Sequence, residues 1–177
     1  MKKLSLLAGL VLALGLAAGA YALAAKRGDN GGAKLIGYSE VPAVSTAAVG
    51  EFKLEIQSDS SISYRLTYRG LEADSLFAHI HFGQRDVNGG VAAFLCGGST
   101  KPAACPAREG TVTGTIVAAD VVGPSGQGIA AGEFTELVRA IRAGKTYANV
   151  HSSKFPGGEI RGQIGAGKKK DGDDRKN

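Results

Sequence analysis

The protein has 177 residues, a length sufficient for one domain with a substantial hydrophobic core. Its formal net charge is +5, and part of that charge comes from lysines near the two ends of the chain. From Lys168 onward, basic and acidic residues nearly cancel, and no aromatic residue lies between them. This composition is not typical of a nucleic-acid-binding arm, so no nucleic-acid partner is expected.

The N-terminus has the pattern of a secretory signal peptide. Two lysines precede an apolar, Gly/Ala-rich run from Leu6 to Ala20, and Ala22-Leu23-Ala24 fits a small-x-small cleavage site. We therefore predict a signal peptide over residues 1–25 and a secreted, periplasmic or cell-envelope protein. If it is not cleaved, the largely apolar run from Leu4 to Ala25 is long enough to span a membrane and would act as an anchor.

The rest of the chain divides into three segments. Residues 26–32 are polar and Gly-rich and are predicted to be a linker. Residues 33–165 are predicted to form the folded domain. Residues 166–177 form a charged tail with almost nothing apolar to bury, so disorder is expected there.

Alternation of apolar and polar residues predicts that the domain consists mainly of strands. The clearest alternating runs are 52–56 and 62–68, separated by Asp59-Ser60-Ser61, which is suited to a hairpin turn. Tyr64 and Tyr68 lie on the apolar face of the second run and are predicted core residues. Further strands are expected at 76–82, 111–118 and 160–164. Turn signals roughly every eight to twelve residues are typical of a β-sandwich or barrel.

The two cysteines lie close together in the part expected to be exported. Cys96 and Cys105 bracket a short loop rich in turn residues, and disulfides persist outside the cytoplasm. Their spacing does not fit a CxxC redox or zinc pair. We predict a disulfide that closes this loop.

One segment follows a helical rather than a strand period. Phe134, Leu137, Val138 and Ile141 have the i, i+3, i+4, i+7 spacing, and Gly144 stands where a C-terminal capping glycine would. The predicted fold is therefore all-β: a Greek-key-like antiparallel β-sandwich or barrel with one short helix.

All three histidines of the chain lie in two strand-like segments, 78–83 and 147–151. His79 and His81 alternate along one strand, so both rings project from the same face, with Cα atoms about 6.6 Å apart. Together with His151 they could form a three-histidine metal site, and copper is the first expectation because affinity rises toward copper. The alternative is structural: the rings would only hydrogen-bond backbone or carboxylate groups and hold two sheets together.

Several polar residues near these segments are candidate partners. Asp86, Asn149 and Glu159 could supply a fourth ligand or support the histidines. Arg161 could contact an anionic ligand, but the favoured interpretation is an ion pair with Glu159 on the same strand face. The sequence contains no complete catalytic signature, so an enzyme is less expected than a binding protein.

Five motifs occur in the order that is typical of one family: Gly37–Val44, Ala78–His81, Asn88–Val91, Asn149–His151 and Phe155–Ile164. Through these motifs the chain resembles a CHRD domain, the module repeated in chordin and also found as a single exported bacterial domain. The resemblance covers about residues 33–164 and implies an extracytoplasmic β-sandwich module. We expect a non-catalytic binding or structural module whose partner is an unidentified extracytoplasmic protein or matrix ligand.

The chain is also similar, more weakly, to copper–zinc superoxide dismutase. That family has a His-x-His strand, a later histidine in a Val-His context and an arginine near the C-terminal strand, which correspond here to His79, His81, His151 and Arg161. The dismutase uses four histidines for copper and more ligands for zinc, whereas this chain has three in all. The resemblance therefore implies at most one mononuclear copper site, with possible dismutase-like redox activity as the alternative function.

Overall fold

The computed structural model describes residues 30–58 and 60–166. These residues form nine strands, one α-helix and three short 3-10 helices. The strands are β1 (Asn30–Ile36), β2 (Val49–Ser58), β3 (Ser61–Arg69), β4 (Ser75–Phe82), β5 (Gly90–Cys96), β6 (Gly110–Ile116), β7 (Thr146–Ser152), β8 (Ile160–Gln163) and β9 (Gly165–Ala166). The helices are α1 (Phe134–Arg142), η1 (Gly37–Ser39), η2 (Ala118–Asp120) and η3 (Ser125–Gln127).

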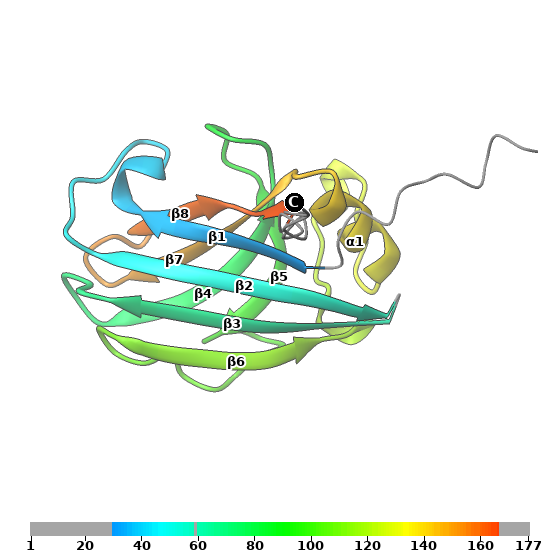
Figure 1. The fold of residues 1–177 in the computed structure, drawn as a ribbon, viewed down its shortest axis with the longest axis horizontal. Coiled ribbons are helices and arrows are strands. Elements are labelled where there is room, and N and C mark those ends of the chain that lie inside the picture. The colour runs from blue at the N-terminus through cyan, green and yellow to red at the C-terminus, as the bar shows by residue number, and fades with distance from the viewer. Residues whose placement is uncertain (1–29, 59, 167–177) are drawn as a thin grey trace, which may run out of the picture.

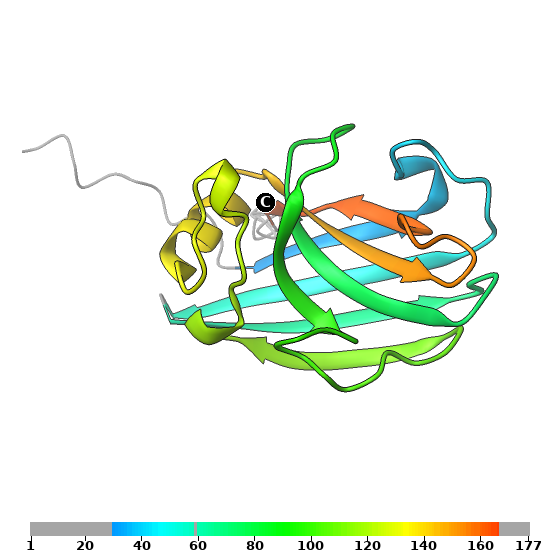
Figure 2. The same cartoon turned by 180° about the vertical axis from the view of Figure 1, so that it is seen from behind.

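The strands form one strongly curved antiparallel sheet. Their order is β5-β4-β7-β8-β1-β2-β3-β6, with β9 paired to β1. The sheet curls so that β4, β5 and β7 lie behind β2, β3 and β6, and the core lies between these two layers (Figures 1 and 2). The predicted all-β sandwich or barrel with a single helix is confirmed for the part of the chain that is described.

The core follows from the alternation along the strands. In β3, Ile62, Tyr64, Leu66 and Tyr68 are buried, and the residues between them are exposed or only half-buried. Alternate side chains of a strand point to opposite faces, so one face of β3 packs inward and the other meets solvent. The prediction that both tyrosines are core residues is confirmed. The hairpin is also confirmed: β2 pairs with β3 up to Ser58, although Asp59 lies outside the described residues.

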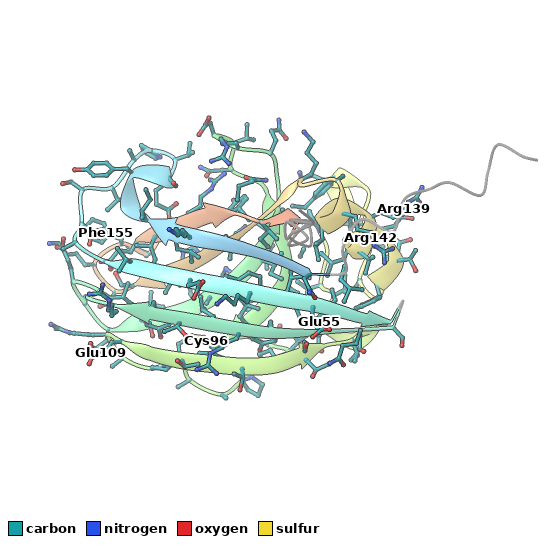
Figure 3. All side chains as sticks on the ribbon, in the orientation of Figure 1. Glu55, Cys96, Glu109, Arg139, Arg142 and Phe155 are labelled. Carbon is teal, nitrogen blue, oxygen red and sulfur yellow. A yellow bond between two sulfur atoms is a disulfide. The ribbon has the colours of Figure 1, made fainter. Side chains whose placement is uncertain are left out.

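Helix α1 covers one end of the sandwich (Figure 1). Phe134, Leu137, Val138 and Ile141 are buried, as the periodicity predicts. Its charged face, which carries Arg139, is turned away from the strands (Figure 3). Gly144 follows the helix with a φ of 66°, a left-handed conformation that glycine adopts without strain.

The predicted disulfide between Cys96 and Cys105 is present, with Cα atoms 5.2 Å apart. It joins the end of β5 to the loop that leads toward β6. The loop that it closes is further held by a hydrogen bond from the Gly97 amide to the Ala103 carbonyl.

Some predicted boundaries were wrong. The predicted linker includes Asn30 to Gly32, but these residues belong to β1 and pair with β2. Their glycines suggested a linker because they have no side chains to show the strand period. The predicted strand at 111–118 ends at Ile116, and Ala166, expected in the tail, pairs with Gly31. The predicted signal peptide and residues 167–177 of the predicted tail lie outside the described residues. Within residues 30–58 and 60–166, no helix is long and apolar enough to cross a membrane.

Candidate metal centre

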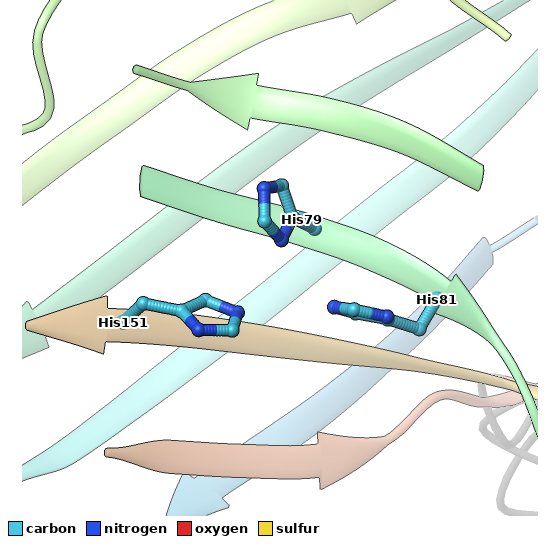
Figure 4. Close-up of side chains that lie close together, drawn as sticks. All are labelled: His79, His81 and His151. Atoms are coloured by element: carbon cyan, nitrogen blue, oxygen red, sulfur yellow. The ribbon is translucent and has the colours of Figure 1, made fainter. Parts of the chain in front are cut away.

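The three histidines lie on neighbouring strands, on the outer face of the sheet. In β4, His79 and His81 alternate with Ala78 and Ile80, which are fully buried in the core, so the imidazoles point to the opposite face. Strand β7 pairs with β4 and brings His151 onto the same face, opposite Phe77. Figure 4 shows the three rings gathered over these two strands.

This outer face is buried, which the alternation by itself does not predict. His79, His81 and His151 are 5%, 8% and 6% exposed. Every residue of β7 is buried. Around the histidines, β4 and β7 are therefore covered on both faces: by the core on one side, and by aromatic side chains and loops on the other.

The three rings are close enough to share one ion. One nitrogen from each ring can be chosen so that all three lie within 4.8 Å of one another. Metal–nitrogen bonds of about 2.0–2.1 Å require nitrogens roughly 3.3–3.5 Å apart around one ion. Small side-chain rotations would therefore close the site.

Backbone carbonyls orient two of the rings. Nδ1 of His81 lies 3.0 Å from the Gly89 carbonyl, and Nδ1 of His151 lies 3.0 Å from the Pro156 carbonyl. A carbonyl only accepts hydrogen bonds, so each neutral ring carries its proton on Nδ1 and has a free lone pair on Nε2. Both Nε2 atoms are buried and have no hydrogen-bond partner. This is the arrangement in which histidine binds metals.

His79 is held by packing. Its ring stacks on Phe77, with ring centroids 4.8 Å apart, and meets Phe94 edge-on at 4.6 Å. Both of its nitrogens are buried without a hydrogen-bond partner. Leaving a buried donor or acceptor unpaired costs about 1–3 kcal/mol, which a bound ion would offset for one of the two nitrogens.

Burial keeps all three histidines neutral at pH 7. Desolvation, followed by the proximity of His151 and His81, lowers the pKa of His79 to about 3. Desolvation lowers the pKa of His81 to about 4, against an opposing effect of the hydrogen bond to Gly89. Burial also lowers the pKa of His151. Metal binding needs the neutral ring, so no proton has to be removed at neutral pH.

A stack of three side chains extends from His81. The Tyr147 ring lies parallel to the His81 ring, with centroids 4.7 Å apart, and Cζ of Arg161 lies 3.5 Å from the centroid of Tyr147. The Gly89 amide donates to the Tyr147 hydroxyl, so the same glycine contacts both rings. The stack links the cluster to a buried cation.

The favoured ion pair between Arg161 and Glu159 is wrong. Nη1 of Arg161 donates to Oδ1 of Asn88 at 3.0 Å, and Nη2 donates to the Val87 carbonyl at 2.6 Å. Oε1 of Glu159 instead accepts from Oγ1 of Thr46 and the amide of Glu72, both at 2.9 Å. Both side chains are bound by loop residues, and the alternation of apolar and polar residues along the strands does not predict where loops lie.

The other candidate partners do not reach the histidines. The Asn149 side chain donates to Oε1 of Glu40 at 2.5 Å and to the Ile160 carbonyl at 2.9 Å. Asp86 is exposed in the loop between β4 and β5. Among the described residues, the only group of three or more His, Cys, Asp or Glu side chains suited to a metal is the histidine cluster itself.

Sequence reasoning missed the groups that support the site. Gly89 and Pro156 lie in motifs that carry the family resemblance. Their role could not be predicted from the sequence, because it is their backbone carbonyls that bind the rings, and every residue has a backbone carbonyl. Tyr147 is adjacent to a recognised motif, whereas Glu40 falls within one and was overlooked. Burial raises the pKa of Glu40 to about 7, against the opposing effects of Asn149 and Arg161.

The domain is thus an antiparallel β-sandwich that carries three buried imidazoles on the outer face of its sheet. A family model described as the CHRD domain matches residues 32–164. The chain therefore belongs to the CHRD domain family, as the motifs predict. A comparison with curated proteins gave no match, and the weaker resemblance to copper–zinc superoxide dismutase is not shown.

Proposed function

We propose that this CHRD domain binds one copper ion through His79, His81 and His151. One observation carries the proposal: three imidazoles face one another with buried nitrogens that have no hydrogen-bond partner. Two of the rings are already fixed in the metal-binding tautomer by backbone carbonyls. Imidazole is a common ligand of copper, and affinity among divalent ions is highest for copper.

The alternative, a purely structural cluster, explains these contacts less well. Structural histidines in a protein interior normally pair both nitrogens, because an unpaired buried polar atom is costly. Here four buried imidazole nitrogens have no partner: both of His79 and one each of His81 and His151. An ion would satisfy three of them at once.

The burial of the imidazole nitrogens favours a role in binding the ion over a catalytic role. The unpaired nitrogens are shielded from solvent, so a substrate such as superoxide could meet the ion only after side chains moved. We therefore favour an extracytoplasmic binding module over a dismutase-like enzyme. The disulfide supports the extracytoplasmic location, since disulfides persist mainly in oxidising compartments.

Metal analysis of the purified protein tests the site. We expect one equivalent of copper per chain after exposure to the metal, and none in a His79→Ala/His81→Ala/His151→Ala variant. Asp86→Asn is the matched control, because this exposed carboxylate does not reach the histidines, and it should bind like the wild type. Stoichiometric binding by the triple variant would refute the site, and a wild-type protein that takes up no copper would end the proposal.

Export has its own test. Mass spectrometry of the protein recovered from cell fractions should find a mature N-terminus close to Ala25 in the secreted or envelope fraction. Recovery of an uncleaved chain from the membrane fraction would instead identify an N-terminal anchor. Recovery only from the cytoplasm would contradict export.

A further inference from the structure

We propose that the site holds copper as Cu(I) in preference to Cu(II) or Zn(II), and that Arg161 strengthens this preference through its stack on Tyr147 and His81. The inference rests on the proposed copper site and specifies the ion's charge state. It follows from the charges around the donors, from their number and from the position of one buried guanidinium.

The donor set provides no negative charge. All three ligands are imidazoles. The neighbouring carboxylates have other partners: Oε1 of Glu159 accepts from Thr46 and from the Glu72 amide, and Glu40 accepts from Asn149. Asp74, five residues before His79, pairs with Arg108. The energy needed to transfer an ion from water to a medium of low polarity grows with the square of its charge. A buried neutral site therefore discriminates strongly against divalent ions.

The number and burial of the donors point the same way. Cu(I) is stable with three nitrogens in a plane, whereas Zn(II) takes four ligands and Cu(II) prefers a tetragonal set. The donor nitrogens are shielded from solvent, and Phe77 and Phe94 pack against His79. This burial disfavours a fourth ligand from solvent, such as water or an anion.

Arg161 adds a positive charge close to the cluster. The guanidinium is 2% exposed and lies on one face of Tyr147, whose other neighbour is the His81 ring. The two stacking distances, 3.5 Å and 4.7 Å, place the guanidinium roughly 8 Å from the His81 ring. At about that distance and an effective dielectric constant of about 20, a unit charge changes the binding constant of an ion by more than tenfold for each charge that the ion carries. The positive charge of Arg161 therefore destabilises bound Cu(II), which carries two positive charges, more than bound Cu(I), which carries one.

The hydrogen bonds of Arg161 go to groups without a net charge: the Asn88 side chain and the carbonyls of Val87 and Gln84. Glu40 is the acid whose charge interacts with Arg161, but burial disfavours its charged form, and its carboxyl accepts from Asn149. Arg161 is thus a positioning residue that acts through its field on the bound ion.

The test compares dissociation constants for Cu(I), Cu(II) and Zn(II) in the purified protein, each against a chelator of known affinity, with Cu(I) handled without oxygen. We expect Cu(I) to bind about a hundredfold or more tighter than either divalent ion. Arg161→Gln should lower the Cu(I)-to-Cu(II) affinity ratio about tenfold, equal to a fall of about 59 mV in the copper potential. Arg161→Lys should retain most of the ratio.

Two further variants keep the test decisive. Asn88→Asp places a carboxylate on the guanidinium from an exposed loop and should lower the ratio even if Arg161→Gln does not fold. Arg65→Gln removes an exposed charge from β3 and should leave the ratio unchanged.

Equal affinities for Cu(I) and Zn(II) would overturn the preference for Cu(I) while leaving the proposed site intact. A Cu(I)-to-Cu(II) affinity ratio unaffected by both Asn88→Asp and Arg161→Gln would overturn the role of Arg161. Binding of no metal would refute the proposed function itself.

Discussion

At the scale of single residues, the cluster depends on contacts that fix ring orientation. His81 and His151 donate to carbonyls of loop residues, and His79 packs between two phenylalanines. The loop that supplies the first carbonyl approaches β4 very closely. Residues with no chemistry of their own therefore decide which nitrogen faces the site.

Gly89 is the sharpest example. A Cβ at this position would lie 1.8 Å from the Phe82 carbonyl, so Gly89→Ala must displace the loop that holds His81. We expect a loss of about 2 kcal/mol or more in unfolding free energy, and copper binding weakened at least tenfold. Urea unfolding and chelator competition measure the two effects. Gly126→Ala is the control, because its Cβ would meet nothing within 4 Å, and equal behaviour of the two variants would contradict this account.

The low pKa values of the histidines predict an acid-sensitive metal-free protein. The folded state keeps each ring neutral below its ordinary pKa of 6.5, whereas the unfolded chain takes up protons there. Stability should therefore fall as the pH is lowered from about 6.5 toward 4, by at most about 1.4 kcal/mol per pH unit for each histidine.

Glu40 acts in the opposite direction. Its raised pKa favours the folded state at low pH, and this contribution is lost as the pH rises through about 7. Urea unfolding of the wild type and of the triple histidine variant between pH 4 and 7.5 separates the effects, because Glu40 is common to both. The wild type should lose more stability on acidification than the variant, and parallel curves would show that the histidines are not held neutral.

At the scale of elements, the site depends on the pairing of β4 with β7 and on the neighbouring strand β5. The register places His81 opposite Tyr147 and His151 opposite Phe77, so the three histidines and the Tyr147 ring come from one pair of strands. Arg161, at the end of the stack, comes from β8. Strand β5 contributes Phe94, which lies against His79. The disulfide joins Cys96, the last residue of β5, to Cys105 in the following loop.

Loss of the disulfide should destabilise the fold more than the site. A Cys96→Ser/Cys105→Ser variant removes a short-loop constraint on the unfolded chain, typically worth about 2–4 kcal/mol. We expect a drop of that order in unfolding free energy by urea titration, with copper affinity changed less than about threefold. Adding reductant should lower the stability of the wild type and leave that of the variant unchanged. A variant as stable as the wild type would contradict the prediction.

At the scale of the whole molecule, a bound ion would link β4 to β7 and stabilise the native state by mass action. At a free copper concentration about a thousand times the dissociation constant, the gain is about 4 kcal/mol. The melting temperature should therefore rise with copper in the wild type and stay constant in the triple histidine variant. A similar rise in both would place the bound copper elsewhere.

Much of the architecture could be predicted from local pattern. Alternation revealed β3 and most of β2, the helical period of Phe134 to Ile141 revealed α1, and the cysteine spacing revealed the disulfide. The start of strand β1, up to Gly32, could not be predicted, because its glycines have no side chains to show a period. The partners of Arg161 and Glu159 were wrong for a different reason, since both side chains are bound by loops far away in the sequence.

That His79 and His81 share one face of a strand follows from the sequence, because the direction of a side chain from a strand repeats every two residues. The family follows from the sequence as well, through motifs that lie in the order typical of CHRD domains. Three features depend on contacts between distant parts of the chain: the burial of this face, the tautomers that the carbonyls of Gly89 and Pro156 impose, and the stacking of Arg161 on Tyr147. Local periodicity fixes where a side chain points, whereas long-range packing of loops decides what covers it.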